Sequence, residues 1–335
     1  MNIVILDDFQ DAIRKLRCAE KIANYKTQIY TNNIKGVGQL AVRLRDAEVV
    51  VLVKERTPFT RQLIEKLPKL KLVVLTGTQT DHIDIPACTE RGIAVAAGTY
   101  SPHANAEYTW ALLMSAARRI PQYVASLKHG AWQQSGLKAA AMPSNFALGS
   151  LLRGKTLGIW SFGRVGQLVA GYGRAFGMDV LVWGSPASQA RAAQEGYALA
   201  ESKTDLFARS DYLSIHLRLS KDNRQSISFA DLSQMKPTAT FINTSNAHLV
   251  APEALVSALN RGRPGLAAID VFEIEPMMQG QALLRLENCI CTPHIGEVEV
   301  ETYERDFSMA FDNIQNFIRG IPSNIINPGA LQVRR

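Results

Sequence analysis

Residue types that could do chemistry recur after short runs of β-branched and aliphatic residues, which is the pattern of buried β-strands. Glycines and polar side chains follow several such runs, at Ser161–Gly166, Gly184–Ser185, His216, Thr244–Asn246, Asp270–Glu275 and Pro293–His294. In an open parallel sheet, ligands bind beyond the carboxyl ends of the strands, because loops and helix N-termini converge there. We therefore expect these segments to build one ligand site.

The segment Gly158–Gly166 has the spacing of a loop that binds the pyrophosphate of a dinucleotide. A predicted strand precedes it and a predicted helix follows, so backbone N–H groups at the helix N-terminus could bind the phosphates. Gly163 and Gly166 occupy the positions of close backbone approach and of helix packing. Ser161 stands at the first glycine position of the motif, and a plain glycine-rich turn is the alternative interpretation.

The end of the next predicted strand should contact the adenosine ribose. An acidic residue at this place binds the ribose hydroxyls and repels a 2′-phosphate. This chain has Gly184 and Ser185 there, and no acid. Ser185 with a nearby cation such as Arg191 could accept the phosphate, so we expect NADPH to be tolerated or preferred.

The elements that must position these residues form two series in which strands and helices alternate, a pattern typical of parallel sheets. The predicted strands cover residues 3–6, 28–30, 49–53, 72–76, 93–96, 156–160, 179–183, 212–215, 240–243, 266–269 and 290–292. The pattern predicts an α/β fold with two doubly wound parallel-sheet domains.

Helical spacing marks further segments, at residues 12–23, 40–45, 104–127 and 302–319. Pro121 should kink or split the third of these helices. The second domain is expected to be inserted into the first, with residues 1–103 and 299–335 in one domain and 104–298 in the other. Residues 128–153 are rich in Ala, Gly and Ser and lack clear periodicity. We interpret the region around 121–153 as an arm that makes the protein a homodimer.

The composition argues against several classes of protein. The net charge is +7, but Lys and Arg are interleaved with acids and form no dense basic run, so we expect small anionic ligands and no nucleic acid. No apolar run approaches the ~18 residues that cross a bilayer, and the first residues do not resemble a signal peptide. The four cysteines lack the spacing of a metal site, and Cys289 and Cys291 should face the same side of one strand. We expect a cytoplasmic protein without a metal or a membrane partner.

Several segments resemble, in order and spacing, the motifs of the D-isomer-specific 2-hydroxy-acid dehydrogenases, the family that includes phosphoglycerate, glyoxylate and formate dehydrogenases. These segments are Lys155–Val182, His216, Asn243–Thr244, Asp270–Pro276 and Thr292–Gly296. The resemblance implies a Rossmann cofactor domain inserted into a flavodoxin-like substrate domain. It also implies an oxidoreductase that transfers a hydride between NAD or NADP and a 2-oxo acid or related carbonyl compound, giving the D-2-hydroxy acid.

The resemblance further implies roles for residues at the strand ends. His294 would exchange a proton with the substrate oxygen, and Glu275 would orient His294 and favour its protonated form. Asp270 would contact the nicotinamide carboxamide and His216 would line the cofactor site, although a capping aspartate and a structural histidine are alternatives. The cofactor site would also include Ser161, Gly163, Arg164, Val165, Gly166, Ser185 and Thr244. Backbone amides of the loop at Gly77 and Thr78 would hold the substrate carboxylate.

Asn246 is the main departure from the family, which has an arginine at this position to bind the substrate carboxylate and polarise the carbonyl. Asparagine offers a neutral amide, and each lost charge-assisted bond is worth roughly 1.5 to 3 kcal/mol. Ordinary 2-oxo acids should therefore be poor substrates unless another cation substitutes; Arg56 is the favoured candidate and Arg218 another. Alternatively, the substrate lacks a carboxylate there.

A dinucleotide-sensing binding protein with little or no turnover is the alternative function, since the co-repressor members of the family have this role. The presence of His294 and Glu275 favours the enzyme, whereas Asn246 favours the sensor.

Overall fold

The computed structural model describes residues 1–137 and 143–333. The chain divides into two compact units: unit 1 comprises Met1–Ser101 and Val298–Arg335, and unit 2 comprises Pro102–Glu297. Unit 2 is therefore an insertion within the sequence of unit 1. Of the arm expected around residues 121–153, residues 138–142 lie outside the described part. Among the described residues, no helix is both long enough and apolar enough to cross a membrane.

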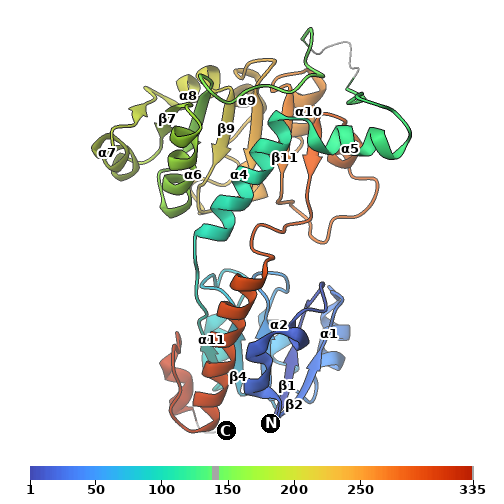
Figure 1. The fold of residues 1–335 in the computed structure, drawn as a ribbon. Coiled ribbons are helices and arrows are strands. Elements are labelled where there is room, and N and C mark those ends of the chain that lie inside the picture. Colours follow the sequence, from blue (N-terminus) through green and yellow to red (C-terminus); the bar gives the residue numbers. More distant parts are fainter. Residues whose placement is uncertain (138–142, 334–335) are drawn as a thin grey trace. The chain divides into compact units, whose positions relative to one another are not determined.

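Unit 1 contains a parallel sheet with the strand order β2-β1-β3-β4-β5 (Figure 1). Its strands are β1 (Asn2–Ile5), β2 (Lys26–Ile29), β3 (Val49–Leu52), β4 (Leu72–Leu75) and β5 (Ala94–Ala96). Its helices are α1 (Val37–Leu44), α2 (Arg61–Ile64), α3 (Ile85–Glu90) and α11 (Val300–Ile318), with the 3-10 helices η1 (Ile13–Lys15), η2 (Arg17–Ile22) and η5 (Pro328–Gln332). Val50 of β3 packs with α1, α2 and α3, whereas its neighbour Val51 packs with η2 and α11. Helices thus cover both faces of the sheet, as its apolar strands require.

The segment 12–23 differs from its sequence pattern, which predicts one helix. That prediction is wrong, because two 3-10 helices cover the segment. Leu16 between them has an extended backbone, which interrupts the helical turns. The carboxylate of Glu304 in α11 accepts the backbone N–H groups of Arg17 and Cys18. A tertiary contact therefore takes the place of the bonds that a continuous helix would make.

Unit 2 contains a larger parallel sheet, with the order β12-β11-β10-β9-β6-β7-β8 among the described residues. Its strands are β6 (Thr156–Trp160), β7 (Asp179–Trp183), β8 (Ala198–Leu199), β9 (Tyr212–Ile215), β10 (Thr240–Asn243), β11 (Leu266–Ile269) and β12 (Cys289–Cys291). The chain passes from β6 outward through β7 to β8, and then returns to β9 on the other side of β6. The order of the strands therefore reverses at β6 and β9, which is where open α/β sheets bind ligands.

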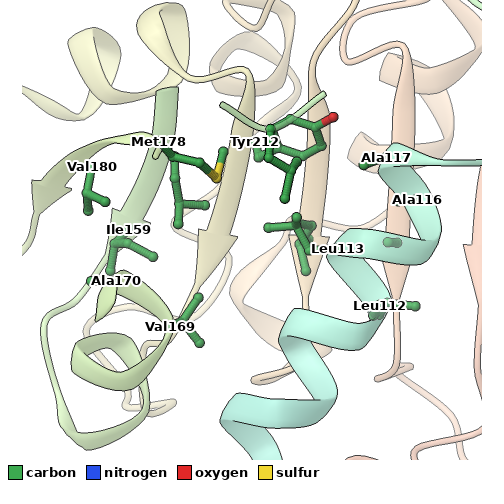
Figure 2. Close-up of a cluster of buried hydrophobic side chains, with 14 of the residues drawn as sticks. Leu112, Leu113, Ala116, Ala117, Ile159, Val169, Ala170, Met178, Val180 and Tyr212 are labelled. Atoms are coloured by element: carbon green, nitrogen blue, oxygen red, sulfur yellow. The ribbon is translucent and has the colours of Figure 1, made fainter. Parts of the chain in front are cut away.

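Helices also cover both faces of this sheet. They are α4 (His103–Ala117), α5 (Ile120–Lys128), α6 (Arg164–Ala175), α7 (Pro186–Gln194), α8 (Lys203–Arg209), α9 (Phe229–Ser233) and α10 (Ala254–Asn260), with the 3-10 helices η3 (Ala247–Leu249) and η4 (Ala282–Arg285). α4 and α6 pack on one face, and Figure 2 shows Leu113 of α4, Ala170 of α6 and Tyr212 of β9 in the core between them. α8, α9 and α10 pack on the other face.

The architecture confirms the α/β fold with two parallel-sheet domains that the alternating pattern predicts. Each predicted strand is present, and its ends are shifted by no more than two residues. The helical pattern over 104–127 is split into α4 and α5, with Pro121 in the first turn of α5, as expected. The sequence does not predict β8, because two residues are too few to show a pattern.

Candidate active site

The loop between β6 and α6 has the geometry of a phosphate-binding turn. Ser161 has φ +81, a backbone conformation that favours glycine. A Cβ at Gly166 would lie 2.2 Å from the carbonyl oxygen of Ser161, so only glycine lets α6 pack this closely on the turn. A Cβ at Gly163, the N-cap of α6, would meet only Ser161 Oγ at 3.9 Å. The space before the N-terminus of α6 is therefore open, and it fits a dinucleotide pyrophosphate.

The end of β7 lies beside this loop. A Cβ at Gly184 would lie 3.3 Å from the Cα of Ser161. The side chain of Ser185 caps α7 by accepting the N–H of Ser188. Arg191 of the same helix donates from Nε and Nη2 to the carbonyl oxygen of Phe162, at 3.4 and 3.2 Å. A cation and a hydroxyl thus stand next to the turn, as a 2′-phosphate would need.

His216 follows β9, next to β6 in the sheet. Its Nε2 lies 3.0 Å from Ser214 Oγ, and its backbone N–H donates to the carbonyl of Trp160. Burial lowers the pKa of His216 to about 4. His216 is therefore neutral near pH 7 and can offer a dinucleotide a hydrogen bond but no positive charge. Its role as a cofactor contact stays a prediction.

The loop after β10 is held by the buried Asn243. Its Nδ2 donates to the carbonyl of Asn246 at 2.9 Å, and its Oδ1 accepts the N–H groups of Ser245 and Asn246. Asn246 caps η3 by accepting the N–H of His248 at 2.9 Å through its Oδ1. Its Nδ2 is the side-chain donor that could bind an anionic ligand. Asn246 is half-buried. It follows β10, which is the direct neighbour of β11 in the sheet.

The loop after β12 is held by Asp270, which is 1% exposed at the end of β11. Its Oδ1 accepts from Thr292 Oγ1 at 2.8 Å and from the N–H of Ile295 at 3.0 Å, and its Oδ2 accepts the N–H of Gly296 at 3.0 Å. Tyr108 of α4 also donates to Oδ1, at 3.2 Å. Burial raises the pKa of Asp270, and the backbone donors act in the opposite direction. Asp270 is thus an anchor for the segment that carries His294.

His294 and Glu275 are brought together from different loops. His294 Nδ1 lies 2.7 Å from Glu275 Oε2, and the other carboxylate oxygen of Glu275 accepts the N–H of Phe272 at 2.9 Å. The imidazole side chain is 52% exposed, so a ligand can reach it. The backbone of His294 has φ 52, in the left-handed region. An exposed imidazole with a fixed carboxylate partner can donate or accept a proton through Nε2.

The contribution of α4 to the site is not predicted from the sequence. Besides Tyr108, Thr109 of this helix bonds Thr244 through the two hydroxyls, at 2.7 Å, and Asn105 donates to Glu297 at 3.0 Å. These polar residues follow helical spacing and could have indicated that one face of the helix meets the strand ends. The pattern does not show which strands the helix crosses.

Arg56, Gly77 and Thr78 belong to unit 1, and their part in the site stays a prediction. Arg56 Nη1 donates to the carbonyl of Asp7 at 2.6 Å, and Nη2 lies 3.3 Å from the hydroxyl of Tyr303. Its guanidinium also lies over the ring of Phe9, 5.0 Å from the centroid. Arg56 is thus held in a defined conformation within its own unit.

Comparisons with known proteins identify relatives of this chain. The family model "D-isomer specific 2-hydroxyacid dehydrogenase, NAD binding domain" matches residues 110–296. A glyoxylate reductase of Aeropyrum pernix is 37% identical over 278 residues, which cover 82% of this chain and 81% of that protein. A D-3-phosphoglycerate dehydrogenase of Methanocaldococcus jannaschii is 35% identical over 291 residues, which are 86% of this chain but only 53% of that protein. The chain thus spans about half the length of this relative.

A solved structure from Ralstonia solanacearum, described as a D-3-phosphoglycerate dehydrogenase oxidoreductase, is similar over almost its full length. It has 58% sequence identity and a TM-score of 0.97, and the match covers 98% of both chains. The shared fold includes both units.

Proposed function

The chain belongs to the D-isomer specific 2-hydroxyacid dehydrogenase family, and we propose that His294 and Glu275 perform its proton transfer. It is an NAD(P)-dependent oxidoreductase that transfers a hydride between the cofactor and a 2-oxo acid. The observation that carries the residue assignment is the 2.7 Å contact between His294 Nδ1 and Glu275 Oε2.

In the direction of reduction, a nicotinamide cofactor held in this unit would supply the hydride for the carbonyl carbon. His294 gives a proton from Nε2 to the carbonyl oxygen as negative charge develops there. The carboxylate of Glu275 holds Nδ1 and favours the protonated imidazole. In the direction of oxidation, the neutral imidazole accepts the hydroxyl proton at the same nitrogen.

Asp270 acts mainly through position. Three backbone or hydroxyl donors from the 292–296 segment, together with Tyr108, bind its two oxygens. These bonds fix the position of His294 beside Glu275. A contact of Asp270 Oδ2 with the nicotinamide carboxamide is compatible with this role, because that oxygen accepts one of these bonds and retains acceptor capacity.

The cofactor is held by the turn after β6 and by the end of β7. Gly163, Arg164, Val165 and Gly166 supply the turn and the first residues of α6, and Ser161 precedes them. With Ser185 and Arg191 in place of an acid, we propose that NADPH binds at least as well as NADH. A fluorescence titration of each cofactor tests this: binding of NADH about tenfold tighter, a difference of ~1.4 kcal/mol, would contradict it.

The substrate carboxylate is bound without the family arginine. Asn246 Nδ2, Arg56, and the backbone N–H groups of Gly77 and Thr78 are the proposed donors. Since a neutral amide binds a carboxylate more weakly than a guanidinium does, we expect slow turnover of ordinary 2-oxo acids.

A screen of 2-oxo acids with NADH and NADPH, on the natural protein and on Asn246→Arg, tests the proposed function. Arginine should raise kcat/KM about tenfold or more, because one charge-assisted bond is worth ~1.5–3 kcal/mol. Asn246→Gln is the matched neutral control. Turnover lost with arginine would instead indicate a substrate without a carboxylate at this place. Cofactor binding without turnover in all three proteins would contradict the enzyme and support the dinucleotide sensor.

We also propose that the protein is a cytoplasmic homodimer. Every described residue of α5 is at least partly exposed, and apolar side chains of α5 and the arm are open to solvent: Ile120, Val124, Leu127, Trp132, Leu148 and Leu151. A second copy of the chain would bury these side chains, and the burial of exposed apolar surface favours association. The free cysteines suit a reducing compartment. Leu127→Glu should lower the mass in solution, whereas Val42→Glu, at an exposed site of unit 1, should not.

A further inference from the structure

Cys289 and Cys291 form a close pair of thiols on one face of β12. Residues two apart in a strand point to the same side, and the two Sγ atoms lie 3.6 Å apart. Of the remaining cysteines, Cys18 and Cys88 are buried, and burial raises the pKa of each thiol to about 12. The pair is therefore the most reactive thiol site of the chain.

The pair lies at the edge of the sheet and is partly buried. β12 pairs with β11 on one side and ends the strand order of unit 2. Both cysteines are partly buried and keep some exposure to solvent. Hydrogen bonding between the two thiols holds the pKa of Cys291 below its ordinary value and raises that of Cys289. Cys291 is thus the thiol that ionises first and attacks.

Cys291 is connected to the two segments that carry His294 and Glu275, to the first by the chain and to the second by one contact. The segment after Cys291 leads directly to Thr292, which bonds Asp270, and then to His294. The Sγ of Cys291 lies 3.9 Å from the carbonyl of Leu283 in η4, at the end of the loop that carries Glu275. A pocket beneath this loop, lined among others by Val250, Phe272, Met277 and Leu283, leaves room for the loop to shift.

We propose that Cys289 and Cys291 are a reversible modification site that reacts with low-molecular-weight disulfides, of which oxidised glutathione is one. The Cys291 thiolate attacks one sulfur of the reagent and releases one glutathione thiolate. Cys289 then loses its proton and attacks the mixed disulfide at Cys291, which releases the second glutathione. The two protein thiols together lose two electrons and two protons, and the reagent is reduced to two thiols.

Closing this disulfide brings the two sulfur atoms from 3.6 Å to about 2.05 Å and fixes both side chains. We expect β12 and the neighbouring η4 to adjust to this bond. The adjustment lies within three residues of His294 and acts on the loop of Glu275. Turnover is expected to fall about tenfold or more, because a misplacement of 1 Å at a catalytic group can cost ~100-fold. This consequence rests on the proposed function, whereas the disulfide itself does not.

The experiment exposes the full-length protein to defined ratios of oxidised to reduced glutathione, blocks free thiols with N-ethylmaleimide, and identifies linked peptides by mass spectrometry. Turnover and NADPH binding are measured on the same samples before and after dithiothreitol. We expect a Cys289–Cys291 link that appears together with the loss of turnover and disappears with its recovery. Cys289→Ser and Cys291→Ser should retain activity and lose the response, whereas Cys88→Ser should keep it.

Two results would overturn the inference. If the two thiols remain unlinked, or retain glutathione as a mixed adduct, at every ratio, the pair is no exchange site. If the link forms and turnover does not change, the pair is not coupled to His294. If no 2-oxo acid is turned over under any condition, the proposed function fails, while the mass of the linked peptide still decides whether Cys289 and Cys291 form the disulfide.

Discussion

The loops after β10 and β12 are held by the same kind of backbone hydrogen bonds, but they present side chains with different chemical properties. In each, a buried polar residue at a strand end binds the backbone of a neighbouring turn: Asn243 for the loop of Asn246, and Asp270 for the loop of His294. The loop of His294 then gains a carboxylate partner, Glu275, whereas Asn246 caps a 3-10 helix with its own side chain. The backbone frame is therefore intact at both places, and of the two residues it presents, Asn246, which we propose to bind the substrate, is the one that departs from the family pattern.

In the function that we propose, proton transfer and carboxylate binding therefore depend on separate parts of this site. This backbone frame tolerates a change of side chain at position 246, because the bonds to Asn243 involve backbone atoms of Asn246 and not its side chain. Each part can thus be tested alone.

The largest expected effect comes from deleting the functional side chain of each loop. His294→Asn should lower kcat about 10²- to 10⁴-fold, because general acid–base catalysis is lost. Asn246→Ala should lower kcat/KM less than about tenfold, because a neutral hydrogen bond is worth ~0.5–1.5 kcal/mol. Steady-state kinetics with NADPH and fluorescence titration of the cofactor measure both variants. Equal losses in the two variants would contradict the division of roles.

A smaller effect is expected from Glu275→Gln. The amide can still accept the N–H of Phe272 but no longer favours the charged imidazole. For reduction, the rate should therefore begin to fall at a lower pH than in the natural protein, and kcat should drop about 10- to 100-fold. A pH profile of kcat for both proteins checks the direction. An unchanged profile would mean that Glu275 has only a structural role.

Asn243 and Asp270, which hold the two loops, can be compared by exchanging the amide of one and the carboxylate of the other. Asp270→Asn places an NH₂ group against donors that now bind a carboxylate, which should cost about 1–3 kcal/mol of unfolding free energy. Asn243→Asp places a buried carboxylate against the carbonyl of Asn246 and should destabilise unit 2 at least as much. Chemical denaturation followed by circular dichroism measures both. If Asp270→Asn keeps full stability and full activity, Asp270 is not the anchor of the His294 loop.

The turn after β6 offers the most local test. Gly166→Ala should destabilise the protein by about 1–3 kcal/mol, since its Cβ would lie 2.2 Å from the Ser161 carbonyl oxygen. Gly163→Ala should leave stability almost unchanged but weaken cofactor binding, because its methyl group would enter open space before α6. Thermal unfolding and cofactor titration separate the two effects. Weaker binding from Gly166→Ala alone would argue against a pyrophosphate at the turn.

Much of the fold and part of the site could be predicted from the sequence. Buried parallel strands require apolar runs such as Val49–Leu52, and these runs are visible without coordinates. The glycine spacing at 163 and 166 follows from contacts within one turn. The segment 12–23 could not be predicted, because the contact of Glu304 with its backbone comes from residues nearly three hundred positions away. The bonds of Tyr108 and Thr109 depend on the angle at which α4 crosses the sheet.

The sequence by itself determined the alternation of strands and helices, the edge of the sheet at which polar residues gather, and the absence of an arginine at position 246. These features depend on local pattern and residue identity. Only the tertiary structure decided that Glu275 reaches His294, that Asp270 holds the following loop, and that Cys289 and Cys291 lie 3.6 Å apart beside that loop. Such contacts arise from the register of neighbouring strands and the path of the loops, which local patterns do not specify.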